Sequence, residues 1–175
     1  MSFINIEIKA RTNRSAQIRQ YLLDHKADFK GTDQQSDTYF HSKKGRLKLR
    51  QGNIENNLIF YERNDQAGPK QSDFSLVKVD DAVSLKEMLT AAMGVKITVI
   101  KKRDIFFIDN VKFHLDELEA LGSFVEIEAS NKYAPLSTAQ LTGQCNFYLR
   151  EFGIKQEDLV TVSYSDMLMA IQGED

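Results

Sequence analysis

The sequence is poor in cysteine, and it lacks both a long apolar run and a strong charge of one sign. Cys145 is the only cysteine among 175 residues, which excludes an intramolecular disulfide and a thiolate metal cluster. The formal net charge is −2, so the basic field that attracts nucleic acid is absent. No segment approaches the ~20 apolar residues of a membrane span, and residues 1–5 lack the features of a secretory signal. These absences predict a soluble, reduced, cytoplasmic protein that binds neither nucleic acid nor membranes.

The length and the apolar content predict one domain over residues 1–175. Within it, hydrophobic periodicity predicts more strands than helices. We expect strands at 3–11, 33–40, 46–52, 57–63, 72–79, 96–107, 111–115 and 122–129. We expect helices at 15–26, 82–92, 138–152 and 163–170, and turn-like segments at 31–33, 68–69 and 132–136. Consecutive short strands with few helices between them are typical of an antiparallel sheet with helices outside it, rather than of a parallel βαβ sheet.

Several expected strands carry charge on one face only. Residues two apart in a strand point to the same side, so Arg46, Lys48 and Arg50 share one face while Leu47 and Leu49 share the other. The same alternation groups Asn5 with Glu7 and Lys9, Lys101 with Arg103, Lys112 with His114 and Asp116, and Glu126 with Glu128. Taken singly, each charged face reads as the solvent side of a half-exposed strand.

Two features of the whole set favour charged faces that meet inside a barrel. Some faces carry a single sign, and neighbouring charges of one sign repel unless an opposite charge lies between them. The apolar faces are supplied with amphipathic helices to cover them, which leaves the charged faces on the concave side. The predicted fold class is therefore α+β: a closed or nearly closed antiparallel β-barrel with a charged lumen and helices packed outside.

Such an interior suits a polyanion that is bound together with a metal ion. Arginine and lysine on several walls neutralise a polyanion, and arginine gives forked hydrogen bonds to phosphate oxygens. Carboxylates would repel phosphate unless a cation lay between them. Hard oxygen ligands suited to Mg²⁺ or Mn²⁺ are offered by Glu7, Asp116, Glu126 and Glu128. His114 is a weaker candidate ligand, which we expect to pack or hydrogen-bond near Asp116.

The order of these segments resembles the CYTH superfamily, also called the triphosphate tunnel metalloenzymes. This superfamily includes class IV adenylate cyclases, thiamine triphosphatases and inorganic tripolyphosphatases. Its hallmark is an N-terminal Glu-x-Glu-x-Lys strand, and Asn5-Ile6-Glu7-Ile8-Lys9 matches the second Glu and the Lys. Residues 46–50, 101–103, 114–116 and 124–128 resemble the basic strand, the later Lys-x-Arg and the acidic C-terminal half, so the resemblance extends over residues 3–168.

The resemblance implies an eight-stranded antiparallel tunnel that binds a triphosphate and uses Mg²⁺ or Mn²⁺. It implies metal ligands at Glu7, Glu126 and Glu128, with Asp116 as a further ligand or as the residue that holds a metal-bound water. It also implies catalytic roles for Glu7, Lys9 and Asp116. It implies that the phosphates are bound by Lys9, Arg46, Lys48, Arg50, Lys101 and Arg103.

Two positions depart from the family pattern. Asn5 stands where the first Glu of the hallmark is usual; it keeps an oxygen but lacks the charge, so we expect one metal site to be weaker or absent. Glu62 stands where family members usually offer a Lys, so we expect either that Arg63 or Lys70 replaces this Lys or that this wall contacts the ligand differently. Arg63 is therefore included among the predicted triphosphate-binding residues.

The resemblance leaves three functions open, each with a small-molecule triphosphate as the ligand. Metal-dependent hydrolysis of inorganic tripolyphosphate, thiamine triphosphate or a nucleoside triphosphate is preferred, because no motif supplies the adenine pocket and oriented ribose that cyclisation requires. A class IV adenylate cyclase that forms cyclic AMP and pyrophosphate is the first alternative. A non-catalytic module that binds polyphosphate or nucleotide is the second. A homodimer is compatible with a small barrel, although the sequence does not show one.

Overall fold

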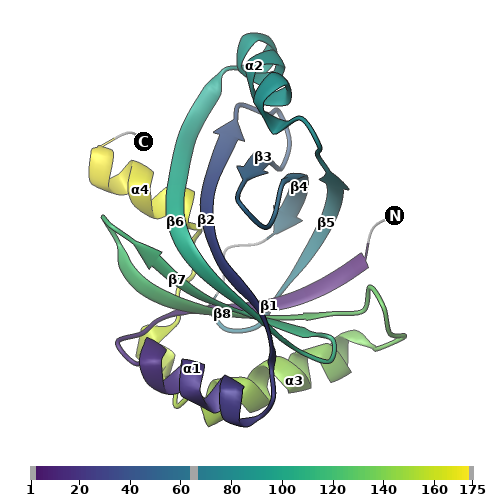
Figure 1. The fold of residues 1–175 in the computed structure, drawn as a ribbon, viewed down its shortest axis with the longest axis vertical. Helices are drawn as coiled ribbons and strands as arrows, with labels where there is room; N and C mark the ends of the chain where they lie inside the picture. Colours follow the sequence, from purple (N-terminus) through teal and green to yellow (C-terminus); the bar gives the residue numbers. More distant parts are fainter. Residues whose placement is uncertain (1–2, 64–66, 174–175) are drawn as a thin grey trace.

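The strands of the chain close into an antiparallel barrel (Figure 1). The computed structural model describes residues 3–63 and 67–173. Neighbouring strands pair antiparallel in the closed order β1-β5-β4-β3-β2-β6-β7-β8. Their bounds are β1 Phe3–Arg11, β2 Asp28–Phe40, β3 Arg46–Gln51, β4 Asn57–Arg63, β5 Lys70–Lys78, β6 Val95–Ile108, β7 Val111–Leu118 and β8 Gly122–Ser130. The predicted eight-stranded antiparallel barrel is confirmed.

The turn expected at residues 31–33 is wrong, because these residues lie inside β2. Gly31 has a φ of 118°, a backbone conformation that glycine adopts without the steric cost that a Cβ would add. The pairing of β2 with β6 shifts register between Phe29 and Gly31. The glycine therefore marks a bulge within a long strand instead of a chain reversal.

Four α-helices accompany the barrel in the described part of the chain: α1 Ser15–Asp24, α2 Ala82–Met93, α3 Thr138–Glu151 and α4 Tyr164–Gln172. A short 3-10 helix, η1, lies at Gln156–Asp158. Three of these helices begin where the sequence offers a cap: the side chains of Asp81, Ser137 and Ser163 accept hydrogen bonds from backbone N–H groups in the first turns of α2, α3 and α4. None of the described helices is long and apolar enough to cross a membrane.

The main apolar core lies between the outward faces of β1, β7 and β8 and the helices α1 and α3 (Figure 1). Ile8, Phe113 and Ile127 pack there with Leu22 of α1 and Leu141 of α3, and all five are fully buried. Burial of each such side chain contributes about 1.5–3 kcal/mol. Because alternate residues point the opposite way, this packing directs the polar side chains of the same strands into the barrel.

A second apolar cluster involves α4 and the inward side chains near one end of the barrel. Tyr164, the first residue of α4, packs with Tyr39 of β2, Ile97 and Val99 of β6 and Phe124 of β8. All five are buried. The charged part of the interior is therefore bounded at this end by apolar packing.

Candidate active site

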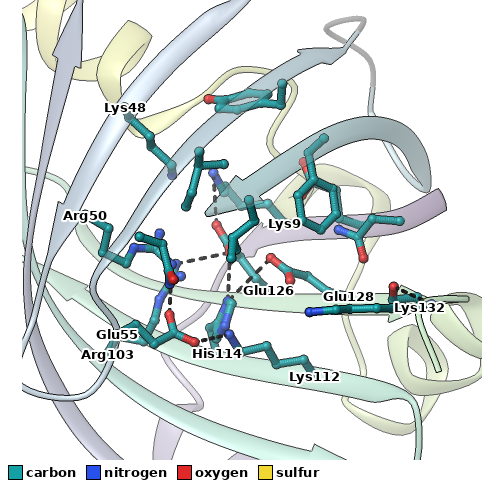
Figure 2. Close-up of a pocket in the computed structure, with 18 of the residues that line it drawn as sticks. Lys9, Lys48, Arg50, Glu55, Arg103, Lys112, His114, Glu126, Glu128 and Lys132 are labelled. Carbon is teal, nitrogen blue, oxygen red and sulfur yellow. Dashed lines mark hydrogen bonds and ion pairs between the residues drawn. The ribbon is translucent and has the colours of Figure 1, made fainter. Parts of the chain in front are cut away.

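The barrel encloses a cavity of about 480 Å³, which lies within the usual size range of small-molecule sites. Its ionisable lining consists of Glu7, Lys9, Lys48, Arg50, Glu55, Lys101, Arg103, Asp109, Lys112, His114, Glu126, Glu128, Lys132 and the phenols of Tyr39, Tyr61, Tyr133 and Tyr164. Figure 2 shows Arg50 and Arg103 on one side of Glu126 and Glu128 and Lys132 on the other. Cations and carboxylates therefore share one enclosed space, as the alternation of the strands predicts.

Asp37 of β2 holds three cations in place beside the cavity. Its carboxylate accepts hydrogen bonds from Lys48 at 3.0 Å and Lys101 at 2.9 Å. It also accepts two from the guanidinium of Arg50, both at 2.9 Å. Burial raises the pKa of Asp37, but the charges of Arg50, Lys101 and Lys48 outweigh it and hold the pKa well below its usual value. This wall therefore presents a fixed group of cations around one ionised carboxylate.

Lys101 is the cation of that group whose pKa is lowered. Its burial lowers the pKa of the ammonium to about 7, an effect that the attraction of Asp37 opposes and that the nearby Arg103 and Arg50 reinforce. A bound anion would reverse this shift, because opposite charge favours the protonated amine. The Lys101 ammonium is therefore placed where a phosphate group would stabilise its charge.

Arg103 is fixed by a second buried carboxylate. Asp116 of β7 accepts two hydrogen bonds from Arg103, each 2.6 Å long, and one of 2.7 Å from the hydroxyl of Tyr164. Arg103 also donates to Glu126 at 3.1 Å. Asp116 is fully buried and does not line the cavity. Its position suits the orientation of Arg103 better than direct contact with a ligand.

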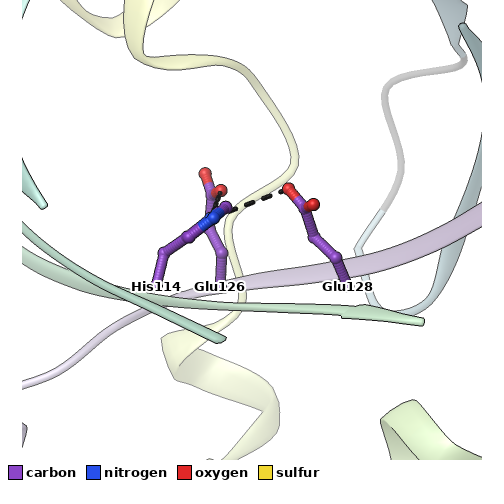
Figure 3. Close-up of side chains that lie close together, drawn as sticks. All are labelled: His114, Glu126 and Glu128. Atoms are coloured by element: carbon purple, nitrogen blue, oxygen red, sulfur yellow. Dashed lines mark hydrogen bonds and ion pairs between the residues drawn. The ribbon is translucent and has the colours of Figure 1, made fainter. Parts of the chain in front are cut away.

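His114, Glu126 and Glu128 form a cluster on the adjacent strands β7 and β8 (Figure 3). The Nδ1 atom of His114 lies 3.0 Å from Glu126 Oε2 and 3.7 Å from Glu128 Oε1. One ligand atom from each residue lies within 4.8 Å of the others. Glu7 of β1 is the register partner of Glu128, which brings a further carboxylate to the same region.

The charges of this cluster fit a divalent cation. Burial and the neighbouring Glu126 carboxylate raise the pKa of Glu128 to about 7. Burial, together with the positive charges of Arg103 and Lys112, lowers the pKa of His114 to about 3, so the imidazole is neutral and keeps a nitrogen lone pair. Two carboxylates and a neutral imidazole are a donor set that Mn²⁺ and Mg²⁺ accept, Mn²⁺ the more readily because of the nitrogen. The residues present therefore fit a divalent metal.

The structure brings together most of the residues that the sequence singles out. Those that line the cavity are Glu7, Lys9, Lys48, Arg50, Lys101, Arg103, Glu126 and Glu128. Lys9 also pairs with Glu126 at 3.1 Å. Their proximity agrees with the predicted roles, which stay predictions.

Two of the predicted residues whose side chains the structure describes, Arg46 and Asp116, are not part of the cavity lining. Arg46 pairs with Asp166 of α4 at 2.9 Å, and Asp116 is held by Arg103 and Tyr164. The side chain of Arg63 lies outside the described part of the structure.

The two departures from the family pattern lie on opposite sides of the barrel wall. Asn5 lines the cavity, whereas Glu62 is exposed and pairs with Lys44 at 3.2 Å. Lys70 is buried, and its ammonium donates to the backbone carbonyl of Thr161 at 3.1 Å. Lys70 is thus engaged by the chain itself and is not part of the cavity lining.

Sequence reasoning missed several residues that shape the site. Asp37 could have been recognised from its place on the alternate face of the 33–40 strand, where it opposes Arg50 in register. Glu55 contacts Arg50 and Lys112 from the loop between β3 and β4, and no periodic pattern marks a loop residue. Tyr164 arrives from the start of α4, far away in the sequence.

Comparisons with known proteins agree with this geometry. The sequence model of the CYTH domain matches residues 4–164. No curated protein sequence matches the chain significantly. Among solved structures, the PH1012 protein of Pyrococcus horikoshii OT3 superposes with a TM-score of 0.79 and 24% identity, over 93% of this chain and 98% of that protein.

Two further structures carry functional descriptions. A Vibrio parahaemolyticus protein proposed to be an adenylate cyclase has a TM-score of 0.78 and 18% identity, over 94% of this chain and 97% of its own. HpAC1 from Hippeastrum, described as having a dominant triphosphatase activity, has a TM-score of 0.63 and 14% identity, over 99% of this chain and 97% of its own. At these identities the likeness shows a shared fold.

Proposed function

The chain belongs to the CYTH domain family, a family of triphosphate tunnel enzymes, and we propose from this premise that it hydrolyses a triphosphate with the help of Mg²⁺ or Mn²⁺. One observation carries the proposal: a cavity whose fixed cations face a cluster of metal-ligating groups within 4.8 Å of one another. A triphosphate with a divalent cation satisfies both halves of this lining at once.

The cations of the cavity would bind the phosphate chain. Arg50 and Lys48 lie on β3 and Lys101 on β6, and Asp37 holds all three by hydrogen bonds. Because these side chains are ordered before the ligand arrives, little rotamer entropy is lost on binding. Arg103, held by Asp116, adds a guanidinium that stabilises charge on the transferred or leaving phosphate.

The metal would be held by Glu126, Glu128 and His114, with Glu7 from the neighbouring strand as a further ligand. A divalent cation at this place supplies neutralisation of the phosphate chain and polarisation of the phosphorus under attack. Lys9, 3.1 Å from Glu126, would keep that carboxylate ionised and bind phosphate from the same side. Hydrolysis then breaks the terminal P–O bond as water oxygen bonds to phosphorus, releasing orthophosphate.

Product analysis by phosphorus NMR tests the proposal. The protein is incubated with Mg²⁺ or Mn²⁺ and, separately, with ATP, thiamine triphosphate and inorganic tripolyphosphate. We expect orthophosphate from at least one of them. Cyclic AMP with pyrophosphate would instead identify a cyclase, and binding of tripolyphosphate without any product would identify a binding module.

A pair of variants connects the activity with the metal cluster. Glu126→Gln removes a metal ligand and should lower turnover at least about a hundredfold. Glu117→Gln changes an exposed residue of β7 that pairs with Lys102 at 3.5 Å, and should leave turnover unchanged. Near-normal rates for Glu126→Gln at low Mg²⁺ would show that the metal lies elsewhere.

A further inference from the structure

One wall of the cavity is apolar, although the others are charged. Ile59 and Tyr61 of β4, Phe74 and Leu76 of β5 and Phe3 of β1 line the cavity together. These five residues are called the apolar wall below. Tyr61 and Ile59 are the register partners of Phe74 and Leu76, and Phe3 is the partner of Phe74, so the five side chains form one continuous patch.

The apolar wall is only partly covered by the protein. Leu76 remains 38% exposed although it faces the cavity. The rings of Phe3 and Phe74 meet edge to face at a centroid distance of 4.3 Å, and both stay partly accessible. Single exposed leucines are common on protein surfaces, but a contiguous apolar patch within a concave site is typical of a surface that a ligand covers.

Four of the five residues of the apolar wall lie on β4 and β5, which contribute no charged group to the described cavity lining, whereas β1 carries Glu7 and Lys9 as well as Phe3. Lys48 and Arg50 belong to β3, Lys101 and Arg103 to β6, and the metal-ligating cluster to β7 and β8. An inorganic tripolyphosphate contains only phosphate groups, so it would satisfy the charged walls and leave the apolar wall in water. A triphosphate ester with a flat ring would contact both kinds of wall.

We propose that the apolar wall binds the aromatic ring of an organic triphosphate, so that the substrate is a ring-bearing triphosphate ester rather than inorganic tripolyphosphate. This inference rests on the proposed function, since it requires the triphosphate to lie along the charged walls. Tyr133, which lines the same cavity and is 85% exposed, offers a second aromatic surface next to Lys132. The ring is a nucleobase or a heterocycle of thiamine, and both present a flat aromatic face.

Calorimetric titrations in EDTA, which prevents turnover, test the assignment with ATP, thiamine triphosphate and inorganic tripolyphosphate. Leu76→Ser removes apolar surface from the wall at a partly exposed position. Val77→Ser is the matched control, because Val77 is the next residue of β5, does not line the cavity and is 61% exposed. We expect Leu76→Ser to weaken the binding of ATP or thiamine triphosphate about tenfold (~1.4 kcal/mol). The binding of tripolyphosphate should weaken less than about twofold. Val77→Ser should change none of the three.

The outcomes separate this inference from the proposed function. If Leu76→Ser loses affinity only for ATP, or only for thiamine triphosphate, the result would support the inference and identify the ring. Equal effects of Leu76→Ser on all three ligands, or no effect on any, would overturn the inference while tight tripolyphosphate binding still supported the charged site. Failure of wild-type protein to bind or hydrolyse any triphosphate would instead defeat the proposed function.

Discussion

At the scale of single residues, buried carboxylates determine where the cations of the cavity stand. Asp37 orients Arg50 and Lys101, and Asp116 orients Arg103. A buried carboxylate in such a pair is costly to remove, because the remaining charge loses its partner without regaining water. The carboxylates therefore stabilise the barrel in the absence of ligand. They also hold the cations in position before a triphosphate binds.

Replacement of Asp37 should reveal both effects. We expect Asp37→Asn to lower the free energy of unfolding by about 3 kcal/mol, because its cations are left without a counter-charge. Tripolyphosphate should then raise the melting temperature more than it does for wild type, since it supplies the missing negative charge. The measurement is urea and thermal unfolding with and without tripolyphosphate.

The control for Asp37→Asn is Asp80→Asn at an exposed position, which should leave the free energy of unfolding unchanged.

The stabilisation by Asp37 should also depend on pH. Because the pKa of Asp37 is held well below its usual value, its stabilising contribution is present above the unfolded pKa. It is lost only as the pH falls through the lowered folded value. The gap between wild type and Asp37→Asn should therefore persist from pH 8 to pH 5; a gap that vanishes at pH 5 would contradict this account.

The role of His114 as a metal ligand can be tested by spectroscopy. If its nitrogen is a ligand, Mn²⁺ bound to wild-type protein should show coupling to ¹⁴N in pulsed electron paramagnetic resonance spectra. His114→Gln should abolish that coupling and weaken Mn²⁺ binding about tenfold, while His41→Gln, at an exposed histidine, should change neither. Unaltered coupling in His114→Gln would place the metal on other residues.

At the scale of elements, β3 shows that one strand face can serve two purposes. Arg46, Lys48 and Arg50 share a face by alternation, but only Lys48 and Arg50 line the cavity. Arg46, at the start of the strand, pairs with Asp166 of α4. The same charged face thus contributes a ligand-binding part and a part that anchors a helix.

This division predicts different effects on tripolyphosphate affinity for two substitutions on the same face. Lys48→Gln should weaken tripolyphosphate binding about tenfold and reduce its dependence on salt, because one charge that faces the ligand is lost. Arg46→Gln should leave affinity within about twofold of wild type. Calorimetry at two salt concentrations measures both. An equal loss of affinity in the two variants would show that Arg46 also contacts the ligand.

At the scale of the whole molecule, α4 connects the C-terminal segment with the barrel interior. Tyr164 donates its hydroxyl to Asp116 at 2.7 Å, and its ring lies 3.8 Å from the Lys9 ammonium. The aromatic face attracts the cation. Through these contacts α4 supports Asp116, which holds Arg103, and contacts Lys9 directly.

Tyr164→Phe isolates the hydroxyl contact while it keeps the ring. We expect a loss of about 1–2 kcal/mol in the free energy of unfolding, because the buried Asp116 carboxylate loses a donor. Tyr133→Phe is the control, since Tyr133 is 85% exposed. Urea unfolding measures both variants, and a loss as small for Tyr164→Phe as for Tyr133→Phe would show that Asp116 does not depend on the hydroxyl.

The sequence by itself determined the elements and their faces. Alternation of polar and apolar residues and helix caps are local signals, so β1 and β4 match their predicted bounds and Glu7, Lys9 and Glu128 were assigned correctly to inward faces. The resemblance to CYTH proteins, carried by short motifs in a fixed order, gave the closed eight-stranded topology that the barrel confirms.

Only the tertiary structure decided which inward residues meet. A strand pattern gives the face of a side chain but not its depth along the barrel, which depends on the stagger between strands. For that reason the charge pattern alone could not show that Arg46 pairs with Asp166 of α4, or that Arg103 and Tyr164 contact Asp116. The apolar wall was likewise hidden in the sequence, because it combines side chains of three strands that become neighbours only when the barrel closes.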